Sequence, residues 1–113
     1  MSAPDCLFCR VIAGEVPGRF VHRDDEVIAI EDINPQAPVH VLVIPVEHSQ
    51  DATGVPGPLL ERMLAVAQRV AEERGVAESG YRLVFNLGPD AGQSVFHTHL
   101  HVLGGRRLAW PPG

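Results

Sequence analysis

Three histidines alternate with other residues in one apolar, β-branched stretch near the C-terminus, the run QSVFHTHLHVL at 93–103. Two-residue spacing is the period of a β-strand, so the pattern predicts that His97, His99 and His101 point to one face of a sheet. Their rings should then follow one another at roughly 6.5 to 7 Å. This row limits the possible folds most, because it requires a sheet with one polar, titratable face.

Apolar spacing elsewhere predicts one long helix, one short helix and four more strands. From Leu60 to Ala71 apolar side chains recur three and four positions apart, as in a helix that packs on a sheet, and Gly75 is its expected end. The other expected elements are a short helix at 6–13, strands at 19–22, 27–31, 39–45 and 81–86, and loops at 32–38 and 50–58. The histidine strand itself is expected at 98–103. This order favours an α+β fold with an antiparallel sheet.

Size, charge and cysteine content narrow the class of protein. A chain of 113 residues is expected to form one domain over 1–113, with a core small enough that dimerisation adds useful burial. The net charge of -5 argues against a DNA or RNA partner, which needs a basic stripe. No signal-peptide pattern or apolar span of roughly 20 residues is visible, so no membrane contact is expected. With only two cysteines, a reducing cytoplasmic setting is the default expectation.

The histidine row permits two kinds of chemistry. A metal ion bound by all three is disfavoured, because consecutive positions on one strand place the rings too far apart to converge on bonds of about 2.0 to 2.1 Å. A neutral imidazole is, however, a competent nucleophile at phosphorus near pH 7. His99, with a histidine on each side, suits that role. The turn-rich loop at 86–92 can aim backbone N–H groups at an anion, which favours chemistry at phosphorus.

The run HTHLHVL at 97–103 resembles the signature of the histidine triad (HIT) family. The resemblance extends to EDINPQAP at 31–38, VIP at 43–45, GQSV at 92–95 and the tail GGRR…WPPG at 104–113. The tail is similar to that of the histidine triad nucleotide-binding proteins, a branch of homodimeric purine nucleoside phosphoramidases. The resemblance implies a HIT fold, with a five-stranded antiparallel sheet, one long and one short helix, and a sheet extended across a homodimer.

The resemblance also implies a double displacement at the α-phosphorus of a purine nucleoside 5′-phosphoramidate of the adenosine type. His99 would attack phosphorus, expel the amine and form a nucleotidyl-histidine that water hydrolyses. His101 would bind a non-bridging oxygen and stabilise the developing charge, while His40 would orient the row from the central strand. The implied catalytic set is His40, Ser94, His97, His99 and His101.

Other residues resemble the nucleotide-binding positions of the family. Asp32 fits a ribose, because a carboxylate can accept from both hydroxyl groups, although from the sequence alone it caps the following turn equally well. Gln93 and Ser94 would contact the phosphate and the leaving group, and Asn86 would lie near the ribose and phosphate. Trp110, in the stiff tail, would reach the active site across the dimer. The expected base slot is lined by Phe8, Val11, Val16, Ile30 and Ile33.

A second group of residues has the composition of a zinc site. Cys6 and Cys9 form a Cys-x-x-Cys pair, which with His48 and His97 makes a plausible tetrahedral set, although the spacing also permits two free thiols. Several bacterial HIT proteins resemble this pattern and hold zinc at these positions. The resemblance therefore implies a structural zinc that ties the N-terminal segment to the catalytic strand and braces His99.

Three other functions share parts of this sequence pattern. A dinucleoside polyphosphate hydrolase of another HIT branch shares the histidine row, but the WPPG tail argues against it. A nucleotidyltransferase is disfavoured because that class usually has Gln where His101 stands. A non-catalytic nucleotide-binding or zinc-braced interaction protein keeps the same residues, with turnover only incidental.

Overall fold

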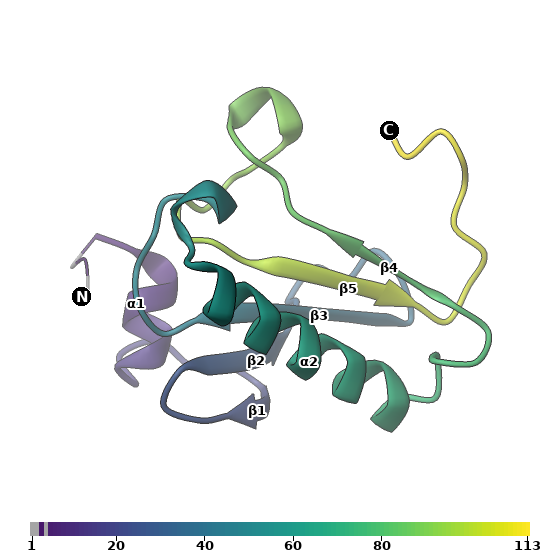
Figure 1. Cartoon of the computed structure of the whole chain (residues 1–113), viewed down its shortest axis with the longest axis horizontal. Coiled ribbons are helices and arrows are strands. Elements are labelled where there is room, and N and C mark those ends of the chain that lie inside the picture. Colours follow the sequence, from purple (N-terminus) through teal and green to yellow (C-terminus); the bar gives the residue numbers. More distant parts are fainter. Residues whose placement is uncertain (1–2, 4) are drawn as a thin grey trace.

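Five strands form one antiparallel sheet in the computed structural model, which describes residue 3 and residues 5–113 (Figure 1). The strands are β1 (Phe20–Arg23), β2 (Val27–Glu31), β3 (Val39–Pro45), β4 (Tyr81–Val84) and β5 (Leu100–Gly104). Their order across the sheet is β1-β2-β3-β5-β4, and every pairing is antiparallel. β3 is therefore central. The predicted α+β class and five-stranded sheet are confirmed.

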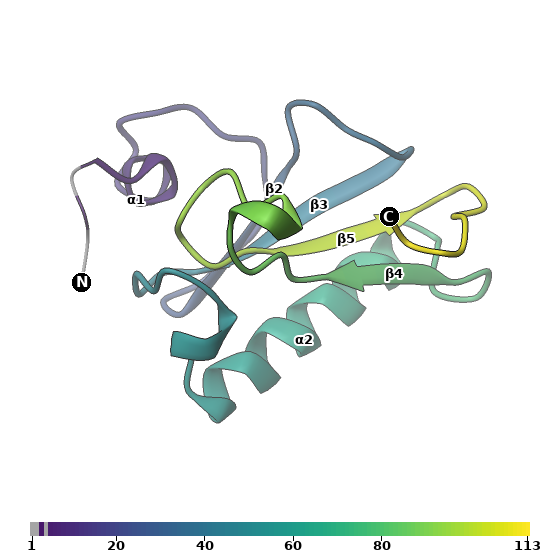
Figure 2. The same cartoon turned by 90° about the horizontal axis from the view of Figure 1, so that it is seen from above.

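The two helices lie on opposite faces of the sheet (Figure 2). α2 (Gly57–Glu73) packs Met63, Val70 and their neighbours against one face, and α1 (Leu7–Ile12) packs Phe8 and its neighbours against the other. Because both faces of β3 are covered, all of its residues are buried. Burial on both sides explains why this strand is apolar at nearly every position.

The ends of α2 follow from its sequence. Pro58 lies in the first turn, where a missing N–H costs the helix nothing, since that group has no partner inside the helix. Gly75 follows the helix with a φ of +74°, a conformation that favours glycine, and its amide donates to the carbonyl oxygen of Glu72. The predicted helix and its end are thus confirmed. Among the described residues, no helix is long and apolar enough to cross a membrane.

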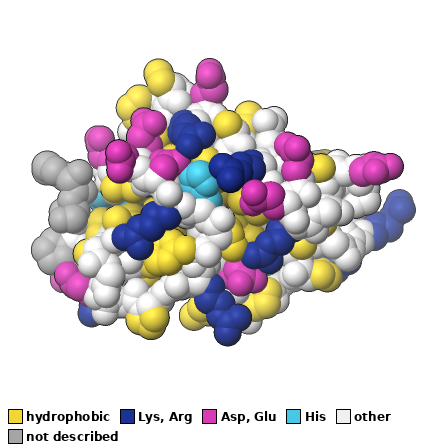
Figure 3. Space-filling view, turned by 90° about the horizontal axis from the view of Figure 1, so that it is seen from below, with side chains coloured by type: hydrophobic (Ala, Val, Ile, Leu, Met, Phe, Trp, Pro, Cys, Tyr) yellow, Lys and Arg dark blue, Asp and Glu magenta, His cyan; other side chains and the backbone are white. Residues whose placement is uncertain are grey.

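Charged side chains of both signs are interspersed on the face of the molecule shown in Figure 3. All nine cationic side chains of the chain are arginines. Several of them form ion pairs with acidic residues of other segments, as between Arg62 and Asp24 and between Arg74 and Glu31. On the face in Figure 3, arginines stand beside acidic side chains and do not line up as a stripe.

The histidine-bearing strand is shorter than the sequence predicts. β5 begins at Leu100, so the prediction of a strand that starts at 98 was wrong, and of the three histidines only His101 lies in a strand. The chain before Leu100 bonds elsewhere: the amide of Thr98 donates to the carbonyl oxygen of Ser49 at 2.8 Å. The rings are also closer than expected, with the centroids of His99 and His101 5.0 Å apart.

Two other segments differ from the sequence prediction in detail. β4 ends at Val84, two residues before the predicted end. The 50–58 segment is more structured than the expected surface loop, because it contains a 3₁₀ turn at Ala52–Gly54 in which the amide of Thr53 donates to the side chain of Asp51. Val55 then turns inward and is 7% exposed, so this segment contributes to the core under α2.

Candidate active site and metal centre

A chain of hydrogen bonds fixes the protons of two histidines on neighbouring strands. The backbone N–H of Gln36 donates to Nδ1 of His40 at 3.0 Å, so the proton of a neutral His40 is on Nε2. That Nε2 lies 2.9 Å from Nδ1 of His101 and 3.3 Å from a carboxylate oxygen of Asp32. His101 accepts at Nδ1 and therefore carries its own proton on Nε2. The sheet thus presents a hydrogen-bond donor at His101.

His99 is held in the complementary tautomer. Its Nδ1 lies 2.8 Å from the backbone carbonyl oxygen of His97, which can only accept, so Nδ1 carries the proton and Nε2 keeps a lone pair. Phe8 of α1 packs edge-on against the ring, with 5.1 Å between centroids, and His99 is only 8% exposed. An immobilised neutral imidazole with a lone pair on Nε2 is the form that a nucleophile requires.

Burial keeps the three imidazoles uncharged. Desolvation lowers the pKa of His99, against the opposing effects of the His97 carbonyl and the Asp32 carboxylate. Desolvation lowers the pKa of His101 to about 4, with further contributions from the neighbouring His99 and His40. Burial also lowers the pKa of His40, which Asp32 partly restores. Near neutral pH the site therefore offers one lone pair and one N–H donor, without a cationic ring.

A cavity of about 300 Å³ opens beside His99 and His101, and we call it the α1 cavity. Its polar lining includes these two histidines, Asp32 and Ser94. Ligand pockets start near about 300 Å³ and combine apolar walls with a few polar groups, as this cavity does. Every residue of the predicted base slot lines it, namely Phe8, Val11, Val16, Ile30 and Ile33. Other residues that line it were not predicted from the sequence, among them Leu7, Pro17, Gly18, Leu42 and Val95.

Asp32 is placed both to cap the following turn and to reach a ligand, the two alternatives that the sequence leaves open. One carboxylate oxygen accepts from the backbone N–H of Asn34 at 2.8 Å, which is the turn-capping contact. The other oxygen faces His40, and the residue also lines the α1 cavity. A single carboxylate therefore connects the 32–38 loop, the histidine relay and the cavity.

Gln93 lies outside the lining of the α1 cavity and braces the neighbouring loop. It is 5% exposed, and its side-chain oxygen accepts from the backbone N–H of Gly88 at 2.9 Å. Its amide nitrogen donates to the carbonyl oxygens of Gln50 and Val95 at 2.7 and 3.2 Å. The polar atoms of this side chain thus fix the loop that carries Ser94.

Two further predicted residues take other positions. Asn86 lines a neighbouring cavity of about 480 Å³, which shares His101 with the α1 cavity and also includes Arg82. Trp110 is 81% exposed, in the C-terminal segment that runs away from the end of β5 (Figure 1). Within one chain, the structure brings neither of them to the α1 cavity.

The predicted zinc ligands form one cluster. The candidate donor atoms of Cys6, Cys9, His48 and His97 all lie within 4.8 Å of one another. The Nδ1 atom of His97 is 3.2 Å from the sulfur of Cys6 and 3.5 Å from that of Cys9. It is also 3.1 Å from Nδ1 of His48. Ligands at zinc bond lengths of 2.0 to 2.3 Å lie about 3.3 to 3.8 Å apart on a tetrahedron. The cluster therefore has the donor set of a structural zinc site and nearly its spacing.

His97 is prepared for such a role by its other nitrogen. Its Nε2 donates to the carbonyl oxygen of Pro45 at 2.8 Å, which leaves the Nδ1 lone pair directed at the thiols. Desolvation lowers the pKa of His97 to about 4, with a further effect of the neighbouring His48, so the ring is neutral as a ligand must be. Both cysteines are free thiols, and burial raises the pKa of Cys6.

Contacts between distant segments assemble this cluster. The hydroxyl groups of Ser49 and Thr98 are 2.7 Å apart, and with the backbone bond between the same residues they hold His48 beside His97. This pair could not be predicted from the sequence, because two hydroxyl residues on separate segments carry no local signal. Cys6 caps the first turn of α1, where its sulfur accepts from the amide nitrogen of Cys9 at 3.3 Å.

Fold and histidine arrangement together define a histidine triad protein, and the chain belongs to the HIT family: a HIT domain sequence model matches residues 13–108. The purine nucleoside phosphoramidase of Escherichia coli K12 is 43% identical over 109 residues, which are 94% of this chain and 92% of the relative. An uncharacterized HIT-like protein of Synechococcus elongatus is 46% identical over 112 residues, 96% of this chain and 97% of its own. The crystal structure of a HIT family hydrolase from Legionella pneumophila superposes with a TM-score of 0.93 and 46% identity, covering 96% of this chain and 100% of that one. The chain is a HIT family hydrolase.

Proposed function

We propose that this hydrolase is a nucleoside phosphoramidase, which cleaves the P–N bond of purine nucleoside 5′-phosphoramidates of the adenosine type. The observation that carries the proposal is the tautomer of His99, whose Nδ1 proton is bound by the His97 carbonyl, leaving Nε2 as a nucleophile at the α1 cavity. The Escherichia coli relative, which is named a purine nucleoside phosphoramidase, supports the substrate class.

The reaction consists of two displacements at phosphorus. In the first, Nε2 of His99 forms a bond to the α-phosphorus and the P–N bond breaks. The electron pair of the P–N bond leaves with the amine. The amine takes a proton that the Ser94 hydroxyl relays from water. The Nε2–H of His101 donates to a non-bridging oxygen and stabilises the developing charge. In the second, water forms a P–O bond, the bond to His99 breaks, and the proton of the water passes to solvent. The products are a nucleoside 5′-monophosphate and an amine.

The α1 cavity holds the nucleoside in this proposal. The base lies against the apolar wall around Phe8, and the free lone pairs of Asp32 accept from the ribose hydroxyl groups. Gln93 acts on the phosphate by fixing the loop whose backbone N–H groups face it, and Asn86 lies near the phosphate from the neighbouring cavity.

Zinc is part of the same proposal as a structural ion. Cys6, Cys9, His48 and His97 would hold it with four protein ligands, which leaves no open position for substrate. When bound, it supplies rigidity only, because a closed four-ligand site binds no water for chemistry. Its proposed effect on catalysis is to fix His97, whose carbonyl oxygen orients His99.

A homodimer completes the proposal. The tail of each chain would approach the site of the other, so that the partner's Trp110, exposed within one chain, lies over the leaving group. Sedimentation equilibrium of the full chain tests this, with a mass of twice 12.2 kDa as the expected result and the monomer mass as the contrary one.

The decisive experiment compares the wild type with His99→Ala on adenosine 5′-phosphoramidate and on a diadenosine polyphosphate, with intact-mass detection of the adenylyl adduct. The wild type should prefer the phosphoramidate and form the adduct, and His99→Ala should do neither. His22→Ala, a histidine on β1 outside the site, is the matched control and should keep full turnover. Preference for the polyphosphate supports the rival hydrolase. Nucleotide binding without turnover supports a non-catalytic binding protein.

A further inference from the structure

A second cavity adjoins the α1 cavity at the 94–96 segment. It measures about 400 Å³ and lies between the N-terminal end of α1 and that segment, with Asp5, Leu7, Ser94 and Phe96 in its lining. It borders the metal cluster, because Cys6 and His48 line it as well. We call it the Phe96 cavity. Leu7, Ser94 and Val95 line the α1 cavity as well, so the two spaces meet at these residues.

Two apolar side chains of this second cavity, Phe96 and Leu7, do not pack into the core. Phe96 is 44% exposed and Leu7 is 43% exposed, and neither belongs to the two core clusters of the described residues. An exposed aromatic side chain in a concave surface offers large contact area to a ligand at little cost in side-chain freedom. The contact surface is therefore available to a bound molecule.

The position of this cavity matches the path of a leaving group. Displacement at phosphorus places the leaving atom roughly in line with the attacking nitrogen and beyond the phosphorus. Glu31 and Asp32 also adjoin a further space, but in the proposed function the ribose lies at Asp32. On the side of the phosphate, two polar residues, Ser94 and His101, connect the α1 cavity to other spaces. The space past His101 includes Arg82, which repels a protonated amine. The space past Ser94 includes Asp5 and, among its described lining residues, no arginine.

We propose that the Phe96 cavity binds the amine half of the phosphoramidate and selects amines with an aromatic or apolar arm, preferably one that also carries a positive charge. Phe96 and Leu7 contact the arm, and Asp5 faces the charge. A cavity of about 400 Å³ has room for a phenylethyl group beside Ser94. This proposal rests on the proposed phosphoramidase function and adds a substrate class to it.

Binding of non-amide probes tests the cavity without turnover. The phenylethyl and methyl phosphodiesters of AMP share the nucleotide and differ only in the arm, and calorimetry gives the ratio of their Kd values. The wild type should bind the phenylethyl ester about tenfold more tightly, which is about 1.4 kcal/mol. Phe96→Ala should bring the ratio near one, with Phe96→Leu between them. Leu64→Ala removes an apolar side chain of the same exposure from α2 and should leave the ratio unchanged.

Turnover of amides tests the charge and separates the two proposals. For the 4-ammoniobutyl amidate of AMP, Asp5→Asn should lower kcat/KM about threefold relative to the unsubstituted amidate, whereas Glu61→Gln on α2 should not. The cavity proposal is overturned, even if amidates are hydrolysed, if Phe96→Ala leaves the Kd ratio unchanged. It is also overturned if the wild type binds the two esters equally well. A failure to hydrolyse any amidate while the Kd ratio responds to Phe96→Ala overturns the phosphoramidase function instead.

Discussion

The Nδ1 atom of His99 lies 2.8 Å from the backbone carbonyl oxygen of His97, whose own ring belongs to the cluster of Cys6, Cys9 and His48. One residue therefore serves both centres, with its backbone in the histidine relay and its side chain in the metal cluster. The same division appears in α1, where the two thiols face the cluster while Phe8 packs on the His99 ring. Loss of the metal cluster should therefore weaken ligand binding in the α1 cavity.

Metal removal is the first test of this coupling. We expect about one zinc per chain in the native protein, and removal by a chelator should lower the unfolding temperature by about 10 °C or more, since ion binding stabilises only the folded chain. AMP affinity should fall with it, because α1 then loses an anchor. The double variant Cys6→Ser, Cys9→Ser should reproduce both effects, and Glu61→Gln, at an exposed position of α2 outside both centres, should show neither. Native protein that is free of metal and indifferent to the chelator would contradict the assignment.

His40 is a positioning residue, and its role can be separated from a merely structural one. Replacement by Phe keeps an aromatic ring of similar shape at this position. It leaves the N–H of Gln36 and Nδ1 of His101 without partners. We expect kcat to fall between about 10-fold and 100-fold, corresponding to about 1.4 to 2.8 kcal/mol, with a smaller change in KM. His40→Gln, whose amide can still donate to His101, should recover part of kcat. Equal losses in both variants would argue for packing alone.

The sequence predicts best those elements whose pattern is set by burial. β2 and β3 have the predicted bounds, because an unbroken apolar run that is covered on both faces allows few alternatives. The residues of the base slot were instead predicted from the resemblance to the HIT family. The start of β5 was not, since the amide of Thr98 bonds to Ser49, and no local pattern reports a partner 49 positions away.

The orientation of side chains in loops could not be predicted from the sequence either. Gln93 stands beside Ser94 in the motif, yet its amide is bound to backbone groups of its own loop and of Gln50. Spacing shows that a polar residue is near a site, but the choice between cavity and backbone depends on which partners the folded loop provides.

The pKa of His101 leads to a prediction for stability against pH. In the folded chain it is about 4, below its ordinary value of 6.5, so between these values the unfolded chain binds a proton that the folded chain excludes. The contribution of His101 is therefore constant above pH 6.5 and is lost as the pH falls toward 4. The unfolding temperature, measured from pH 7.5 to 4.5, should fall less steeply in His101→Gln than in the wild type. Parallel curves would show that folding does not lower the pKa of His101.

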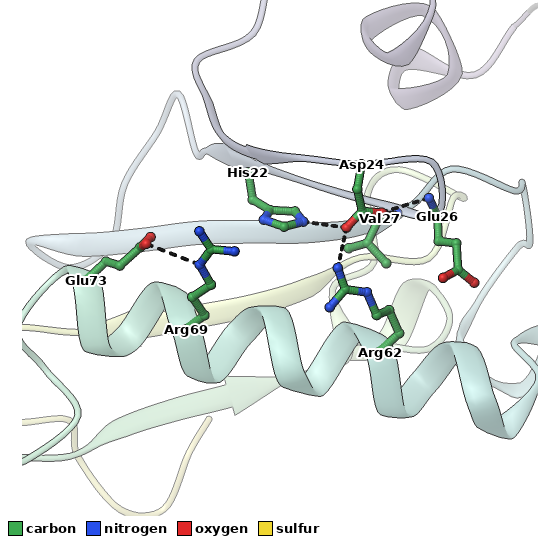
Figure 4. Close-up of polar contacts among 7 residues, drawn as sticks. All are labelled: His22, Asp24, Glu26, Val27, Arg62, Arg69 and Glu73. Carbon is green, nitrogen blue, oxygen red and sulfur yellow. Dashed lines mark hydrogen bonds and ion pairs between the residues drawn. The ribbon is translucent and has the colours of Figure 1, made fainter.

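A cluster on the α2 side of the sheet was not found from the sequence. One carboxylate oxygen of Asp24 lies 2.6 Å from Nε2 of His22 and 2.6 Å from a guanidinium nitrogen of Arg62 on α2 (Figure 4). The other accepts from the amides of Glu26 and Val27 at 2.8 and 2.9 Å. Asp24 thus closes the β1–β2 hairpin and ties it to the long helix.

Replacing Asp24 should accordingly destabilise the fold at neutral pH. Burial raises the pKa of this carboxyl, but the hydrogen bonds from His22, from two backbone amides and from Arg62 outweigh it and hold the pKa well below its usual range. Its stabilisation is therefore complete above the ordinary value of 3.8 and is lost as the pH falls below it.

Asp24→Asn should lower the free energy of unfolding in urea by about 2 kcal/mol at pH 7, because hydrogen bonds to a charged group are each worth roughly 1.5 to 3 kcal/mol. The deficit relative to the wild type should shrink at pH 3. The exposed pair of Arg69 and Glu73 on α2 provides the control in the same view (Figure 4). Glu73→Gln should cost no more than about 0.5 kcal/mol, since an exposed pair of this spacing contributes little. Equal losses in the two variants would mean that Asp24 acts only as one more surface charge.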